Sequence, residues 1–275
     1  MSVVSPERVE DRALLEGALR RNAALHLYEI GDLDDAFFPL TSYFVERDAS
    51  RNVEAVALRY DGGDPPTLVA LAGDDREHAA LSRLVPDLLR AEARPVYAHF
   101  TPPLRSTIES VATIDGRGHH AKFVWTDRAR AEEVGTDDVI QLGPSHADEM
   151  LALLDAHYPE HFFHPRVLDD GLAFGIREGG RLVACAGVHV LSRRYRVAAL
   201  GNVVTSTTHR GRGLALATCA ALLRALAPIA DVVGLNVDRD NRAALRCYER
   251  LGFSFVAEYD EAVLHPTAAG PSGNN

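Results

Sequence analysis

The stretch Thr205-Ser206-Thr207-Thr208-His209-Arg210-Gly211-Arg212-Gly213-Leu214-Ala215 decides the fold of the second half of the chain. An apolar run, 197–204, ends where this polar stretch begins, and an alanine- and leucine-rich segment, 214–226, follows its two glycines. This order predicts a strand, a turn and a helix. The first turn of a helix has unpaired N–H groups and partial positive charge, and glycine lets an anion approach the backbone closely. The stretch therefore predicts a phosphate-binding loop.

The composition predicts a soluble globular protein with two domains. The chain has 275 residues, of which 47% are hydrophobic and 25% are charged. A formal net charge of −10 argues against nucleic-acid binding and is compatible with an amine substrate. Three cysteines (Cys185, Cys219 and Cys247) lie in apolar surroundings, which predicts reduced thiols and a cytoplasmic location. No signal-peptide pattern or membrane-spanning apolar run occurs, so we expect no membrane partner.

The first half of the chain predicts an α/β domain over 1–130. Ser5-Pro6-Glu7 predicts the start of a helix, because serine caps helices and proline suits their first turn. Alternation over 52–60 predicts a strand, and 75–91 predicts an amphipathic helix. This half contains no glycine-rich phosphate loop. His119-His120 would point to opposite faces of a strand and chelate poorly, so we expect no metal site.

A polar segment, 127–137, separates the two predicted domains. It carries both charges and no aromatic residue, which is typical of a linker. We expect the second domain over 137–266 and a disordered tail over 267–275. Both halves share a loose order of helix, hairpin and helix, so a degenerate duplication stays open.

Two motifs of the second half resemble the signatures of the GNAT superfamily of CoA-dependent N-acetyltransferases. Arg210-Gly211-Arg212-Gly213-Leu214-Ala215 matches Arg/Gln-x-x-Gly-x-Gly/Ala. The block Leu235-Asn236-Val237, Asn241, Ala244, Tyr248 and Leu251-Gly252-Phe253 is similar to the second signature. The resemblance covers about 139–264. It implies an α/β (α+β) fold with a mixed central sheet, flanked by helices and splayed between two strands to admit acyl-CoA. The preceding α/β domain would be a degenerate tandem copy or an unrelated cap.

The resemblance assigns CoA-binding roles to three parts of this half. The strand before the loop would pair its backbone with pantetheine, the loop would hold the pyrophosphate, and the second block would contact the cofactor. These cofactor-binding residues are Val203, Val204, Thr205, Arg210, Gly211, Arg212, Gly213, Leu214, Ala215, Asn236, Asn241, Ala244 and Tyr248. Two of them have an ordinary structural alternative, since Arg212 could be a plain exposed arginine and Asn241 a helix cap.

The resemblance also makes Tyr248 the general acid that protonates the departing CoA thiolate, because a tyrosine pKa near 10 suits that basicity. The general base stays open, since 198–202 lacks the glutamate that many relatives carry on this strand. Its candidates are His189, Glu261, His161 and His164. Cys247 lies about 100° around the helix from Tyr248, which predicts a core thiol and disfavours an acyl-cysteine intermediate.

The sequence therefore predicts an N-acetyltransferase that uses acetyl-CoA and no metal. The acetyl group would pass by direct attack to a primary amine of a small molecule or a peptide. The alternative is a catalytically inactive acyl-CoA sensor or regulatory protein, which the missing glutamate admits. A P-loop nucleotide enzyme is disfavoured, because no Lys-Ser/Thr pair follows the loop. The oligomeric state stays open, a homodimer included.

Overall fold

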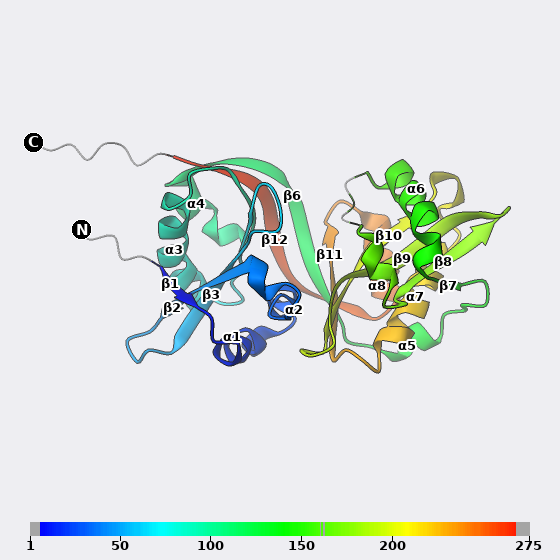
Figure 1. Cartoon of the computed structure of the whole chain (residues 1–275), viewed down its shortest axis with the longest axis horizontal. Coiled ribbons are helices and arrows are strands. Elements are labelled where there is room, and N and C mark those ends of the chain that lie inside the picture. The colour runs from blue at the N-terminus through cyan, green and yellow to red at the C-terminus, as the bar shows by residue number, and fades with distance from the viewer. Residues whose placement is uncertain (1–5, 160, 162, 268–275) are drawn as a thin grey trace, which may run out of the picture. The chain divides into compact units, whose positions relative to one another are not determined.

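The computed structural model describes residues 6–267 apart from 160 and 162. Compact packing divides the chain into two units (Figure 1). The first consists of the described parts of Met1–Lys122 and Ala257–Asn275, and the second of the described part of Phe123–Val256. Two strands, β6 (Ala112–Trp125) and β12 (Phe253–Pro266), therefore contribute residues to both units.

The first unit is a mixed sheet with helices. Besides parts of β6 and β12, its elements are β1 (Glu7–Val9), α1 (Arg12–Leu19), α2 (Leu27–Gly31), β2 (Thr41–Arg47), β3 (Val53–Tyr60), β4 (Thr67–Ala70), α3 (Asp75–Arg90), β5 (Val96–Phe100) and α4 (Arg105–Glu109). The strand order is β1-β2-β3-β4-β5-β12-β6. Neighbours from β1 to β4 are antiparallel, β4 and β5 are parallel, and β5 is antiparallel to β12.

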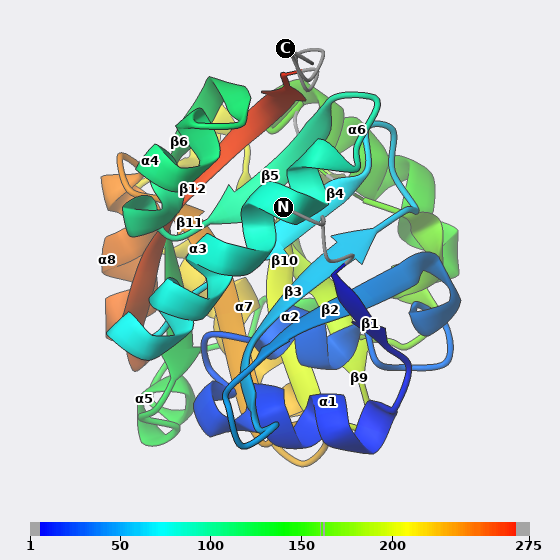
Figure 2. The same cartoon turned by 90° about the vertical axis from the view of Figure 1, so that its left-hand side faces the viewer.

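Helix α3 covers one face of this sheet, as Figure 2 shows. Its apolar residues recur at helical spacing, so they form one buried stripe. Leu81, Leu84 and Leu88 of this stripe pack with Leu68 of β4 and Ala98 of β5 in the main core of the unit. The predicted helix over 75–91 is confirmed by this element.

The start of the chain differs from the prediction. Glu7–Val9 forms β1, which pairs with β2, and α1 begins only at Arg12. The side chain of Asp11 caps α1 by accepting hydrogen bonds from the N–H groups of Ala13 and Leu14, at 3.0 and 3.1 Å. The helix predicted to start at Ser5-Pro6-Glu7 is therefore wrong, because strand pairing takes the residues that this local signal would place in its first turn.

The second unit repeats the arrangement of the first. Its elements are α5 (Ala129–Glu132), β7 (Ile140–Leu142), α6 (Ala147–His157), β8 (Ala173–Glu178), β9 (Arg181–Ser192), β10 (Val197–Thr205), α7 (Leu214–Leu226), β11 (Val232–Asp238) and α8 (Arg242–Arg250), with the adjoining ends of β6 and β12. Neighbours from β7 to β10 are antiparallel, and β10 is parallel to β11. In both units a fourth strand leads through a helix to a parallel fifth strand. The predicted α/β class and the tandem resemblance of the two halves are confirmed.

The predicted domains, at 1–130 and 137–266, are each one continuous segment of the chain. The first compact unit instead consists of two separate segments. The second part of β12 packs with the first unit, through its pairing with β5. The predicted linker, 127–137, contains α5, which packs against α7. Of the predicted tail, 267–275, only Thr267 lies among the described residues. Its N–H and its hydroxyl each donate to the carbonyl of Val111 at 2.9 Å.

Candidate active site

The parallel strands β10 and β11 pair along only part of their length. Their register runs from Val197↔Val232 to Ala199↔Gly234, while β10 continues over 200–205 and β11 over 235–238. Main-chain groups along these continuations can bond an extended ligand that carries amides. The strand residues predicted to bind CoA lie on these two continuations: Val203, Val204, Thr205 and Asn236.

The loop after β10 adopts a backbone that requires its glycines. Gly211 and Gly213 both have φ near 79°, a left-handed conformation that costs other residues roughly 1–2 kcal/mol. No atom lies within 4 Å of the position that a Cβ would take at either residue. Helix α7 begins at Leu214, with Gly213 as its N-cap and no acidic residue in its first turn. The helix start therefore offers N–H groups and open space to an anion.

A carboxylate holds the side chains of this loop. The Arg212 guanidinium donates two hydrogen bonds to Glu178 at the end of β8, at 3.0 and 2.5 Å. His209 Nε2 lies 3.5 Å from the same carboxylate, and the bonds from Arg212 lower the pKa of Glu178. Arg210 Nε donates to the carbonyl of Thr205 at 3.3 Å. A phosphate contact by Arg212 would therefore compete with Glu178.

Helix α8 presents Tyr248 beside β12. Asn241 caps the helix, since its Oδ1 accepts from the N–H of Ala244 at 3.1 Å, which confirms its structural role. Tyr248 is buried, and its ring meets that of Phe253 edge-on at 5.8 Å. Trp125 Nε1 donates to the carbonyl of Leu251 at 2.9 Å and holds the end of the helix. The cofactor contacts of Asn241, Ala244 and Tyr248 stay predictions.

The structure separates the candidate bases. His189 is exposed, at a bulge of β9 opposite the step from Ala199 to Leu200. His161 bonds Asp155 through Nε2 at 2.9 Å, and His164 is exposed nearby. Glu261 lies in the first unit, and its role as a base stays a prediction.

Glu261 instead belongs to a network of the first unit. It accepts hydrogen bonds from the hydroxyls of Tyr97 and Tyr259. Burial favours the neutral acid, but the nearby His99 and His120 and the two tyrosines outweigh it and lower the pKa of Glu261. His119 bonds Asp260 rather than Glu261, as alternation along β6 predicts. Among the described residues, no group of three His, Cys, Asp or Glu is arranged to hold a metal ion.

The three cysteines are poor nucleophiles. Burial raises the pKa of the Cys185 thiol to about 12, that of Cys247 to about 11, and that of Cys219 well above its usual value. The thiolate is the reactive form, so these thiols are protonated and inert near neutral pH.

In the direct acetyl transfer that the sequence predicts, no acyl-cysteine forms, so replacing Cys247 with alanine should leave the rate within about twofold of wild type. Steady-state thiol release from acetyl-CoA measures this. A loss of activity that follows Cys247→Ala but not Cys219→Ala would instead indicate a covalent intermediate on Cys247.

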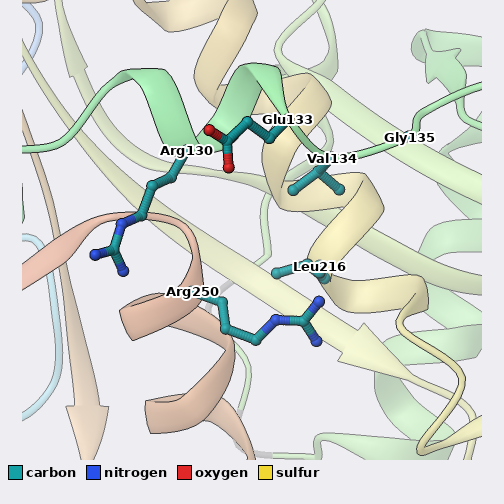
Figure 3. Close-up of a pocket in the computed structure, with 6 residues that line it drawn as sticks. All are labelled: Arg130, Glu133, Val134, Gly135, Leu216 and Arg250. Atoms are coloured by element: carbon teal, nitrogen blue, oxygen red, sulfur yellow. The ribbon is translucent and has the colours of Figure 1, made fainter.

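A pocket of about 480 Å³ lies beside the first turn of α7. Figure 3 shows its lining residues, which are Arg130, Glu133, Val134, Gly135, Leu216 and Arg250. Leu216 belongs to α7, and the side chain of Arg250 runs from the end of α8 toward it. Arg130 is held by Asp127 and by the carbonyl of Glu249, each at 3.0 Å. The pocket thus combines apolar side chains with two arginines and the carboxylate of Glu133, next to the first turn of α7.

Residues 141–253 match the model of the acetyltransferase (GNAT) family. This part of the chain therefore matches a GNAT acetyltransferase domain, and we call it the GNAT domain. The match includes both motifs on which the resemblance to the GNAT superfamily depends. The predicted resemblance is therefore confirmed. No curated protein matches the sequence.

Solved structures extend the GNAT fold to the whole chain. A tandem GNAT protein from the clavulanic acid biosynthesis pathway aligns with 17% identity and a TM-score of 0.54, over 98% of this chain and 99% of that one. A GCN5-related N-acetyltransferase from Sphaerobacter thermophilus aligns with 14% identity and a TM-score of 0.58, over 98% of this chain and 100% of that one. A GNAT-family acetyltransferase from Colwellia psychrerythraea aligns with 13% identity and a TM-score of 0.56, over 96% of this chain and 100% of that one. At these identities the likeness concerns the fold alone.

The first unit lacks the features that distinguish the GNAT domain. Its parallel strands stay paired to their ends, at Ala70↔Phe100. The start of α3 is occupied by its own carboxylates, since Asp74 accepts from the N–H of Glu77 at 2.8 Å and Glu77 accepts from the N–H of Gly73 at 2.7 Å. These negative charges fill the place that an anion would take. The first unit therefore shares the strand arrangement of the second without its strand separation or its open helix start. In the described part of the chain, no helix is long and apolar enough to cross a membrane.

Proposed function

We propose that the GNAT domain transfers the acetyl group of acetyl-CoA to a primary amine. One observation carries this proposal: β10 and β11 separate after Ala199 and Gly234, directly before a glycine loop that opens α7. The gap suits an amide-bearing pantetheine arm, and the helix start suits the pyrophosphate. On CoA binding, Arg212 would exchange its hydrogen bonds to Glu178 for hydrogen bonds to the phosphates.

The pocket beside Leu216 supports the same ligand. From the pyrophosphate, the nucleotide end of CoA would extend along α7 into this space. Leu216 and Val134 provide apolar contact for a base, and Arg250 provides a guanidinium for a phosphate. No described residue forms an ion pair with Arg250, so its charge is available to a ligand.

The chemistry would be a direct attack. The neutral amine forms a C–N bond with the thioester carbonyl carbon, and the C–S bond breaks to release the CoA thiolate. A backbone N–H at the end of β10 would stabilise the negative charge that develops on the carbonyl oxygen. Tyr248 would give its proton to the thiolate. We propose His189 as the proton acceptor, because it lies on β9 against Gly201 of the separating strand and is open to solvent.

A thiol-release assay with acetyl-CoA and a panel of small-molecule and peptide amines tests the function. Turnover of any amine, with CoA binding measured by calorimetry, supports the enzyme. The rival acyl-CoA sensor predicts tight CoA binding and no release of thiol above the rate without protein. Absence of CoA binding would reject both.

One CoA should bind per chain. The GNAT domain has the strand gap and the free helix start, whereas the first unit has paired strands and carboxylates at the start of α3. Calorimetric titration with CoA should therefore give a stoichiometry of one, and Gly213→Val should remove it completely. A stoichiometry of two would contradict our proposal that only the GNAT domain binds CoA.

A further inference from the structure

The chain contains a single lysine, and its side chain is buried. Of the 29 lysine and arginine residues, only Lys122 is a lysine. It lies on β6 in the first unit and is 4% exposed. Lysine is seldom buried unless its charge is balanced, because removing an ammonium group from water is costly. The groups around Lys122 must therefore take the place of water.

Two tyrosine rings from other elements lie against the Lys122 ammonium. Its Nζ is over the ring of Tyr28 in α2, 4.5 Å from the centroid, and 5.4 Å from the ring centroid of Tyr259 in β12. The rings of His99 and His120 pack on Tyr259, with centroids 5.3 and 5.4 Å from its own. A cation within about 6 Å of a ring centroid is attracted to the negative face of the ring. The two tyrosines therefore stabilise the buried charge.

Two carboxylates add negative charge near this lysine. Glu29 follows Tyr28 in α2, and Glu261 lies on the same face of β12 as Tyr259. Burial disfavours the ammonium form of Lys122 and the charges of Glu29 and Glu261 favour it, with the net effect that its pKa is lowered to about 8. The side chain is therefore a cation at neutral pH.

The carboxylate of Glu29 can accept a further hydrogen bond. Glu29 is 3% exposed, and its Oε1 lies 3.0 Å from Nδ1 of His26. Its Oε2 has no hydrogen-bond partner among the described residues. Burial favours the neutral acid, but the bond with His26 and the charges of His26 and Lys122 outweigh it and lower the pKa of Glu29. A buried, ionised carboxylate with one unbonded oxygen is a site for an N–H donor.

We infer that α2 and β12 of the first unit form a binding site for a primary ammonium group, and that Lys122 is its tethered occupant. We call this site the ammonium cage, and its residues are Tyr28, Glu29, Tyr259 and Glu261. Aromatic faces and carboxylates select a cation, and the lysine shows that a straight alkyl chain ending in an ammonium group fits. The inference does not depend on acetyl transfer. It implies that the native cage is closed to external amines, because a side chain of the protein fills it.

Lys122→Ala empties the cage. The cation n-propylammonium has the three carbons and the nitrogen that this substitution removes. At about 100 mM it should raise the melting temperature of Lys122→Ala by about 2–5 °C, because a ligand that binds only the folded state stabilises it. The wild-type protein, whose cage is filled, should not respond. Differential scanning calorimetry at constant ionic strength measures both shifts.

Two controls separate the cage from an ordinary cavity. The neutral alcohol 1-propanol has the same length as n-propylammonium and should not stabilise Lys122→Ala. Leu81→Ala opens a cavity in the apolar core beside α3, and n-propylammonium should not stabilise that variant. Adding Glu29→Gln to Lys122→Ala should remove the response, because glutamine keeps the shape of the side chain and loses its charge. Equal stabilisation by 1-propanol, or none by n-propylammonium, overturns the inference.

The wild-type protein allows a test that needs no destabilised variant. Because Lys122 is the only lysine, labelling with ¹³C-lysine gives a single Hε–Cε signal in NMR spectra. The rings of Tyr28 and Tyr259 should shift this signal from its position in the unfolded chain. Its pH titration should give a pKa near 8, below the value of about 10.4 for an exposed lysine. A signal at the unfolded position that titrates near that ordinary value overturns the inference, even where Lys122→Ala does not fold.

Discussion

Replacing Gly213 with valine should abolish CoA binding. Gly213 holds φ near 79° at the start of α7, and the space next to it is open. A valine would fill that space and strain the backbone, which removes the close approach of a phosphate to the N–H groups. Losing two charge-assisted hydrogen bonds weakens binding by about 3–6 kcal/mol, or at least about 100-fold. Calorimetry with CoA measures the loss.

Gly171→Val serves as the control for strain alone. Gly171 also has a positive φ, of 67°, but it lies in the turn before β8, where a Cβ would meet only the end of the Gln141 side chain. Both variants should lower the melting temperature by comparable amounts. Only Gly213→Val should lose CoA. Retained CoA affinity in a folded Gly213→Val protein would refute the assignment of the loop.

Replacing Tyr248 with phenylalanine should lower the rate of acetyl transfer by about 10²–10⁴-fold, the usual contribution of a general acid. The phenylalanine ring preserves the edge-on contact with Phe253, so the fold and the affinity for CoA should change little. Single-turnover kinetics and CoA calorimetry together measure the effect. An equal loss of rate and of CoA affinity would show a binding role for the hydroxyl and reject it as the acid.

Tyr195→Phe provides the matched control for Tyr248→Phe. Tyr195 is also buried in the second unit, at 4% exposure, but it belongs to the turn between β9 and β10. Removing its hydroxyl should leave kcat unchanged. A comparable rate loss in both variants would point to a general effect on the packing of the unit.

The elements around the glycine loop are predictable from sequence, because their signals are local. Glycine followed by an alanine- and leucine-rich run predicts a helix over 214–226, and α7 has these bounds. The pair Gly179-Gly180 lies between two apolar runs, which is typical of a hairpin, and it forms the turn between β8 and β9. The GNAT motifs lie within the loop, α7, β11 and α8, so the resemblance to the family is visible in the sequence alone.

The residues of a strand do not determine which other strand it pairs with. The apolar pattern near the end of the chain predicts closing strands, but not that Leu264 pairs with Val96 of β5. The sequence likewise does not predict that Glu261 of this strand accepts hydrogen bonds from Tyr97 and Tyr259.

The two-unit membership of β12 has a consequence for synthesis of the chain. Strand β5 is complete by Phe100, yet its neighbour in the sheet, 260–264, is made only after the whole GNAT domain. A domain normally folds as it leaves the ribosome, the N-terminal one first. Here the first unit cannot complete its sheet, because β5 lacks its neighbour until residues 260–264 have been synthesised. The unit that is made first is therefore the last to complete its sheet, and it can do so only after the GNAT domain has been translated.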